Sequence, residues 1–134
     1  MLDVLTDILT SGKTSRLYKR MVYDGQIAQS VSAYQYGQEI AGQLGVEVTA
    51  KPGKTLTEME TVVDAELQKL LKDGVTEKEI QTSLNNKEAD IINARSTVLG
   101  KANALASFID LTGDPENYNR ELQRYQGITP KEVL

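Results

Sequence analysis

The feature that most constrains the fold is a change in hydrophobic period between residues 27 and 51. In the second part of this stretch, small or apolar residues alternate with mostly polar ones, which predicts a strand with one buried and one wet face. The run from Ile27 to Tyr36 predicts a preceding strand, and Gly37 and Gly42 bracket the connection. We therefore expect an antiparallel hairpin over residues 27–50. The alternating small or apolar positions are Gly42, Leu44, Val46, Val48 and Ala50.

The polar face of the second strand allows two interpretations. Glu47, Thr49 and Lys51 could contact a bound peptide, because exposed strands recruit peptides through backbone hydrogen bonds. An ordinary solvated face explains the same alternation and is the interpretation that we favour.

Helical patterns lie on both sides of the hairpin. Apolar spacing predicts helices over residues 2–11 and 15–24. Ser15 is placed as the N-cap of the second helix, and Gly25 is placed as a left-handed residue that closes it.

The pattern of residues 55–134 predicts helices throughout, so this part forms the helical half of the chain. Thr55 with Glu58, and Thr76 with Glu79, have the spacing of capping boxes, which begin helices. The sequence thus predicts a single partial domain over residues 1–134, of the α+β class, with an antiparallel sheet backed by helices. A further apolar stripe in this half comprises Leu99, Ala102, Leu105, Ala106 and Ile109.

Both ends of the chain fall inside helical patterns. Thr129 and Glu132 form another capping box about one turn before the last residue, and an apolar stripe is already in progress at Met1. We expect a domain truncated at both ends. Because two strands make a marginal sheet, we also expect a missing partner strand, an open sheet edge and self-association of the chain.

The composition excludes several functions. The 134 residues include no cysteine and no histidine, so disulfides, thiolate nucleophiles and the commonest metal ligand are absent. We therefore expect no catalytic residue, metal ligand or cofactor in this chain. The net charge is −4, and no basic run is interleaved with aromatic residues, which argues against a nucleic-acid partner. No apolar run approaches the roughly 20 residues that span a bilayer.

Two blocks of sequence resemble a known family. The segments 14–20 (Thr-Ser-Arg-Leu-Tyr-Lys-Arg) and 26–33 (Gln-Ile-Ala-Gln-Ser-Val-Ser-Ala) resemble the insulinase/pitrilysin family of zinc metallopeptidases. They are similar in particular to the second, non-catalytic domain of its bacterial members and of mitochondrial processing peptidase. The resemblance continues through residues 41–56 and 74–79 and extends to Gly113-Asp114-Pro115 and Ile128-Thr129-Pro130.

The resemblance implies a function for the protein to which the domain belongs. In this family zinc is held by a His-x-x-Glu-His helix and a distant glutamate in another domain, where it activates water for peptide hydrolysis. The present chain would be inactive alone, would shape the substrate cavity and would support a catalytic domain or homologous partner chain. The implied location is periplasmic or secreted. The alternative is a scaffold or interaction subunit of the same fold that has lost peptidase activity.

The resemblance also points to two positions in the substrate cavity. The family's non-catalytic lobe often carries an arginine and a tyrosine that grip the substrate near the zinc. Alignment on residues 27–31 places these at Val22 and Gln29. Valine donates no side-chain hydrogen bond and glutamine has no ring, so this lobe has lost the grip. Some bacterial members divide the work between two chains, and the departure suggests the zinc-carrying chain or a degenerate one.

Overall fold

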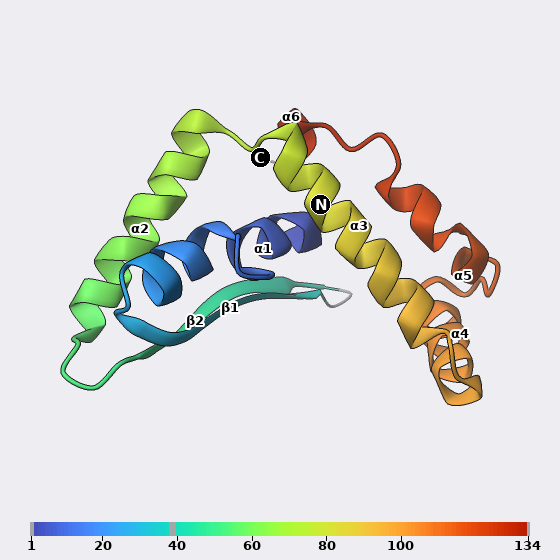
Figure 1. Cartoon of the computed structure of the whole chain (residues 1–134). Helices are drawn as coiled ribbons and strands as arrows, with labels where there is room; N and C mark the ends of the chain where they lie inside the picture. Colours follow the sequence, from blue (N-terminus) through green and yellow to red (C-terminus); the bar gives the residue numbers. More distant parts are fainter. Residues whose placement is uncertain (1, 38–39, 134) are drawn as a thin grey trace. The chain divides into compact units, whose positions relative to one another are not determined.

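The computed structural model describes residues 2–37 and 40–133 and has the predicted α+β class (Figure 1). The described part divides into two compact units. The first unit runs to Ser83 and includes the segment from Thr129, and the second unit is Leu84–Ile128. The elements in chain order are α1 (Leu2–Thr10), the π-helix η1 (Tyr18–Asp24), β1 (Ala28–Gly37), β2 (Gly42–Ala50), α2 (Leu56–Asp73), α3 (Glu77–Ala94), α4 (Val98–Thr112), α5 (Asn117–Arg120), the 3₁₀-helix η2 (Glu121–Tyr125) and α6 (Pro130–Val133).

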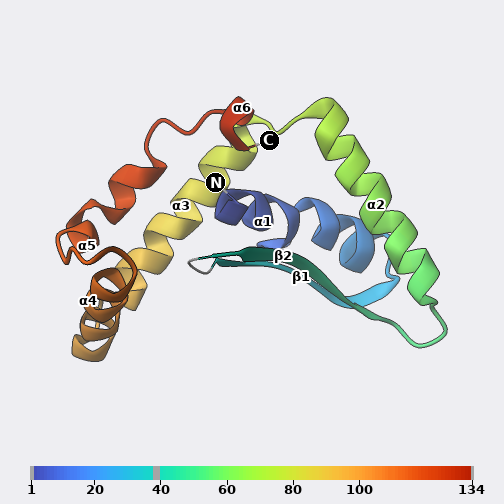
Figure 2. The same ribbon diagram turned by 180° about the vertical axis from the view of Figure 1, so that it is seen from behind.

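The sheet of the first unit is an antiparallel hairpin of β1 and β2. Val31 lies opposite Val48 and Ala33 lies opposite Val46, so the alternating apolar residues share one face, as predicted. Helices α1 and α2 lie on the same face of this hairpin (Figures 1 and 2). The core of the unit gathers there, because burial of apolar side chains is the dominant stabilising term. Its most deeply buried large side chains are Val4, Leu9, Leu17 and Met21.

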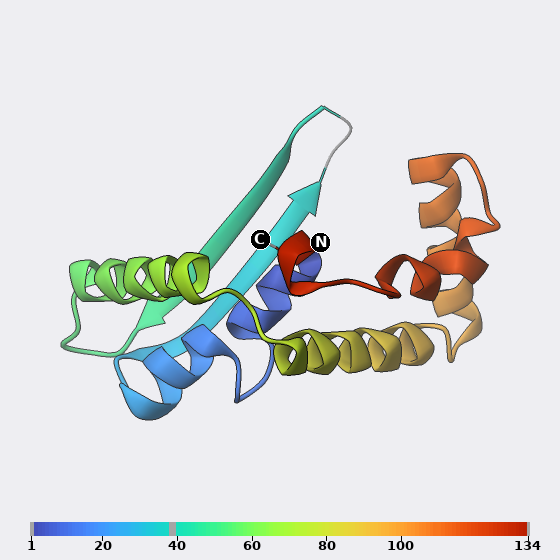
Figure 3. The same ribbon diagram turned by 90° about the horizontal axis from the view of Figure 1, so that it is seen from above.

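Helix α1 lies along β1 (Figure 3) and contacts its outer edge. The backbone N–H of Ala33 donates to Thr10 Oγ1 at 2.9 Å, across 23 residues of sequence. A polar side chain of the helix thus satisfies a strand N–H that the hairpin leaves unpaired.

The turn between η1 and β1 differs from the prediction. Gly25 has φ −76°, in the right-handed region, and Gln26 carries the positive φ of 47°. The reason is the wider helix: the Gly25 N–H donates to the Arg20 carbonyl at 3.1 Å, the five-residue spacing of a π-helix. The next bond, from Ile27 N–H to the Met21 carbonyl at 2.9 Å, places the left-handed residue one position later.

Ser15 stands directly before the second helix, and its carbonyl accepts from the Lys19 N–H at 2.9 Å, but its side chain does not cap the helix as predicted. Ser15 Oγ donates to the Gly12 carbonyl at 2.7 Å instead of accepting from a helix N–H. This bond closes the turn after α1, and Gly12 adopts a φ of 81° there. The helix that follows begins without a side-chain cap.

The first two of the three predicted capping boxes are confirmed. Thr55 N–H donates to Glu58 at 2.8 Å while Glu58 N–H donates to Thr55 Oγ1 at 3.2 Å. Thr76 and Glu79 make the same reciprocal pair at 2.8 and 3.2 Å. Each box satisfies two backbone donors that a helix start leaves free, which fixes the starts of α2 and α3.

The second unit is held by polar contacts more than by a core. Arg95 forms an ion pair with Glu121, and its guanidinium lies 3.9 Å from the centre of the Tyr118 ring. Helix α4 has no buried side chain among the described residues, and its apolar stripe is exposed: Leu99 is 70% and Ile109 is 53% accessible. Apolar spacing predicted this helix, but spacing alone does not determine what covers it.

Candidate functional site

The two predicted cavity residues lie on irregular backbone. Val22 is half-buried within the π-helix η1. Gln29 is exposed in β1, at the irregularity where Ala28 pairs with Ala50 but Ser30 pairs with Thr49. Gln29 is therefore the extra residue of a β-bulge. Both π-helices and bulges are frequent at functional sites, because they redirect a side chain.

Backbone bonds bring the two segments together. The Ile27 N–H donates to the carbonyl of Met21, next to Val22, and the Ile27 carbonyl accepts from Lys51 N–H at 2.9 Å. The end of η1 is thus tied to the start of β1, two residues before Gln29. The side chains at the two positions offer an apolar group and an amide, which can contact a peptide but cannot supply an acid, a base or a metal ligand.

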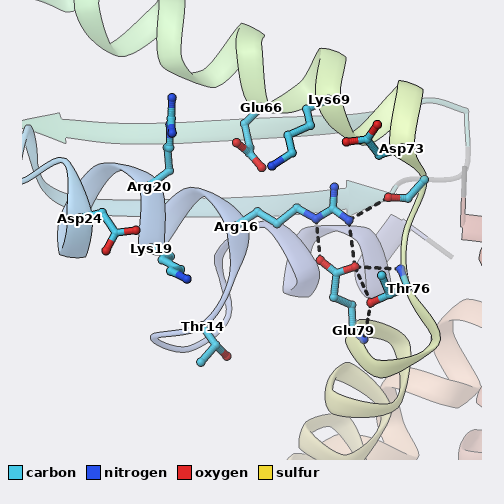
Figure 4. Close-up of a pocket in the computed structure, with 11 residues that line it drawn as sticks. Thr14, Arg16, Lys19, Arg20, Asp24, Glu66, Lys69, Asp73, Thr76 and Glu79 are labelled. Carbon is cyan, nitrogen blue, oxygen red and sulfur yellow. Dashed lines mark hydrogen bonds and ion pairs between the residues drawn. The ribbon is translucent and has the colours of Figure 1, made fainter.

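A charged cavity of about 540 Å³ lies elsewhere in the first unit, between η1, α2 and the α2–α3 turn (Figure 4). It is lined by as many acidic as basic side chains. Glu66 is 91% buried (9% accessible), and its carboxylate points toward the cavity. The charged lining residues are Arg16, Lys19, Arg20, Asp24, Glu66, Lys69, Asp73 and Glu79.

Arg16 and Glu79 form the central contact of this cavity. Arg16 Nε and Nη2 donate to the two Glu79 carboxylate oxygens at 2.6 and 2.9 Å, and Nη2 also donates to the Gly74 carbonyl at 2.8 Å. The bidentate geometry is the strong form of the ion pair. The Gly74 carbonyl follows the C-terminal end of α2, where the helix dipole favours a cation. One side chain thus joins the start of η1 to the turn between α2 and α3.

The sequence interpretation missed this contact. Glu79 was identified only as a capping residue, and Arg16 only as part of a family motif. The two residues are 63 positions apart, and local spacing carries no information about such a pair. The available signal was chemical: a capping glutamate uses one oxygen, and its second oxygen remains free to accept from an arginine.

The pair shifts the acidity of Glu79. Its pKa falls from 4.5 to about 2, chiefly because Arg16 donates hydrogen bonds to the carboxylate, with further bonds from Thr76. A carboxylate whose pKa is lower in the folded than in the unfolded state stabilises the fold at any pH above the unfolded-state pKa. This stabilisation is lost as the pH falls through the folded-state pKa.

We expect Glu79→Gln to lower the free energy of unfolding by about 1–2 kcal/mol at pH 7, since the pair is partly solvated. The difference from the wild type should shrink between about pH 5 and pH 2, as the wild-type carboxylate takes up a proton. Urea titrations at several pH values measure the difference in the free energy of unfolding between the variant and the wild type. Glu77→Gln, an exposed carboxylate of the same helix turn, is the control. A difference between Glu79→Gln and the wild type that is unchanged from pH 7 to pH 2 would contradict this assignment.

The residues present do not fit a catalytic zinc ion. Within residues 2–37 and 40–133, no group of three or more Asp and Glu side chains is arranged to hold a metal ion. A catalytic zinc site ordinarily has three protein ligands that include histidine, which this chain lacks. In the same described ranges, no helix is both long and apolar enough to cross a membrane.

The fold is of the α+β class, and the described residues 2–37 and 40–133 do not supply the ligands of a catalytic zinc ion. The chain belongs to the peptidase M16 family: the profile of the peptidase M16 inactive domain matches residues 1–87. The match covers nearly all of the first unit and stops a few residues into the second. This confirms the family and the non-catalytic domain that the sequence motifs predicted.

Solved structures extend the likeness to the second unit. The inactive peptidase domain of a candidate zinc protease from Bordetella parapertussis has a TM-score of 0.84 at 19% identity, covering 98% of this chain and 71% of that chain. A candidate zinc protease from Bordetella pertussis Tohama I has a TM-score of 0.82 at 20% identity, with the same coverage. The periplasmic protease PqqL from Escherichia coli has a TM-score of 0.74 at 20% identity, covering 98% of this chain and 15% of that chain.

The TM-scores of 0.74 to 0.84 establish a shared fold. No sequence among curated proteins matches the chain. The chain spans 15% of the length of the periplasmic protease and 71% of the length of the solved inactive domain.

Proposed function

We propose that this chain is the non-catalytic lobe of a zinc metalloprotease, where it shapes the cavity for a peptide substrate and supports the zinc-carrying half. The observation that carries the proposal is the likeness of the whole chain to an inactive peptidase domain, together with a donor set that does not fit zinc. Zinc, the Lewis acid and the activated water then belong to another domain or chain. The match covers 98% of this chain, both compact units included, and 71% of the solved inactive domain, which supports one partial domain over residues 1–134.

Val22 and Gln29 are the residues that we place against the substrate. The two segments that carry them are joined by the hydrogen bond from the Ile27 N–H to the Met21 carbonyl. Val22 lies in a π-helix and Gln29 in a β-bulge, and a bulge redirects a side chain. Neither can grip a substrate by charge or ring stacking, so the partner half supplies the main binding groups. The periplasm is the proposed compartment, since one structure of this fold is a periplasmic protease.

A scaffold subunit is the second candidate. The observation that favours it is that Val22 and Gln29 stand where the family often has a substrate-binding arginine and tyrosine. Neither side chain offers the positive charge or the ring of those residues. A lobe without a grip could serve only to hold its partner in place.

Reconstitution of this chain with a zinc-carrying half separates the two candidates. The partner with this chain should cleave an unstructured peptide, and omission of this chain should abolish most cleavage. Val22→Ala and Gln29→Ala should lower kcat/KM by less than about tenfold, because neither makes a strong contact. A stable complex without cleavage would favour the scaffold. Full cleavage by the partner alone would contradict a role of this chain in the cavity.

A further inference from the structure

The charged cavity between η1, α2 and the α2–α3 turn is built entirely inside the first unit. Its lining residues lie between positions 14 and 79, within the segment that the inactive-domain profile matches. Neither end of the sequence contributes to it. Its volume of about 540 Å³ falls in the usual range of small-molecule sites, about 300–1,000 Å³.

Glu66 places an unpaired carboxylate in this cavity. The residue is 9% accessible, and its carboxylate points toward the cavity (Figure 4). Within residues 2–37 and 40–133, it makes no hydrogen bond and no ion pair. No side-chain oxygen in these ranges is both shielded from solvent and unpaired, so the Glu66 oxygens reach the space of the cavity. Because a buried charge is costly unless it is paired, Glu66 offers an acceptor to a positively charged ligand.

Positively charged groups face the same space. Arg16 donates to Glu79 and Gly74 through Nε and Nη2, and its Nη1 makes no hydrogen bond to the part of the chain that the structure describes. This nitrogen is directed toward α2 (Figure 4). The ammonium group of Lys69, about one helical turn after Glu66, points into the same space (Figure 4). The cavity thus presents an unpaired carboxylate beside two groups that donate to anions.

The balance of charges selects the kind of ligand. The charged lining residues other than Arg16 and Glu79 are three basic and three acidic side chains. An anion alone would lie near three carboxylates, and a cation alone would lie near three basic groups. The described residues 2–37 and 40–133 include no group of three or more acidic side chains that is arranged to hold a metal ion. A small molecule that carries both charges complements both sets of side chains.

We propose that this cavity binds a small zwitterion, a free α-amino acid or a dipeptide. Its ammonium group donates to Glu66, and its carboxylate accepts from Arg16 Nη1 and Lys69. Hydrogen bonds between charged groups are stronger than those between neutral groups. The contact with Glu79 already holds the Arg16 guanidinium in place, so little side-chain freedom is lost when a ligand binds. The proposal does not depend on the proposed protease function.

A simpler role for Glu66 is to balance the charge of Arg16. The pKa of Arg16 is raised chiefly by its hydrogen bonds to Glu79, and to a smaller extent by the charges of Glu79, Glu66 and Asp73. The attraction between Glu66 and Arg16 acts without a hydrogen bond, so it leaves the Glu66 oxygens available to a donor. Only a ligand site requires two opposite charges on an added molecule, and this requirement separates the two roles.

Titration of the chain with four probes, followed by nuclear magnetic resonance of the backbone amides, tests the proposal. L-alanine and L-alanyl-L-alanine carry both charges, N-acetyl-L-alanine carries only the negative charge, and L-alaninamide carries only the positive charge. At least one zwitterion should bind with a Kd of about 1 mM or tighter. The two blocked probes should bind at least about tenfold more weakly, because each lacks one charged contact. The tighter of the two zwitterions identifies the spacing of the ligand charges.

Variants of α2 assign the ligand charges to residues. Glu66→Gln keeps the size of the side chain and removes its charge, so it should weaken binding by at least about tenfold. Lys69→Met changes an exposed residue and should weaken binding by at least about fivefold, whether or not Glu66→Gln folds. Glu60→Gln is the matched control, since Glu60 is exposed on the same helix and does not line the cavity. It should leave the Kd unchanged.

The location of the amide shifts is a second readout. The shifts should gather in η1, the C-terminal half of α2 and the α2–α3 turn, which surround the cavity. No shift with either zwitterion at about 10 mM would overturn the proposal. Equal binding of the blocked probes, unchanged binding by Glu66→Gln, or shifts confined to the second unit would also overturn it. A loss of stability in Glu66→Gln without binding of any probe to the wild type would show that Glu66 only balances Arg16.

Discussion

Replacing Gly25 with alanine is expected to destabilise the first unit by about 2–3 kcal/mol, the cost of an overpacked site. An added Cβ would lie 2.5 Å from the Arg20 carbonyl oxygen, and this neighbour is backbone that cannot rotate away. The same carbonyl accepts the Gly25 N–H in the π-helix, so relief of the clash costs a hydrogen bond. Urea or thermal unfolding followed by circular dichroism measures the effect.

Gly37→Ala is the matched control. A Cβ there meets only the end of the Gln35 side chain, at 2.9 Å, and that side chain can rotate away. We expect a change within about 0.5 kcal/mol. A loss below about 1 kcal/mol for Gly25→Ala would mean that the close approach to Arg20 is not a constraint on the turn.

Replacing Arg16 with alanine is expected to lower the free energy of unfolding by about 2–3 kcal/mol. The change removes both hydrogen bonds to Glu79 and leaves the Gly74 carbonyl without its arginine donor. The Arg16 side chain is 14% exposed and that of Glu79 is 27% exposed, so the pair lies between the surface and buried cases.

Arg20→Ala is the control for Arg16→Ala. Arg20 lines the same cavity but is exposed, so its loss should change stability by less than about 0.5 kcal/mol. The double variant Arg16→Ala/Glu79→Gln should cost less than the sum of the two single changes, because the residues are in contact. Additive losses would show that the pair does not act as a unit.

Local rules predicted the parts of the fold that depend on neighbours in sequence. Alternation placed Val46 and Val48 on the inner face of a hairpin, and the Thr76–Glu79 spacing predicted a capping box that the structure contains. Both rest on contacts within a few residues, where spacing determines geometry.

The same rules failed where a distant partner or an unusual helix decides the outcome. Gly25 was expected in the left-handed region, but the π-helix transfers the positive φ to Gln26. The contact between Arg16 and Glu79 joins segments 63 residues apart. The exposure of α4 depends on what lies against it, which its periodicity does not record.

The candidate site was accessible from the sequence only through the family resemblance. The resemblance assigned Val22 and Gln29, and nothing in their own chemistry marks them. The structure adds that they occupy a π-helix and a bulge. Their role in a substrate cavity stays a prediction.

Metal content and peptidase activity of the purified chain test the central claim most directly. The chain is incubated with excess zinc and dialysed, its metal is counted by mass spectrometry, and cleavage of an unstructured peptide is followed with and without chelator. The account predicts far less than one zinc per chain and no chelator-sensitive cleavage, because the ligands of a catalytic site are absent. One tightly held zinc per chain with chelator-sensitive cleavage would contradict it.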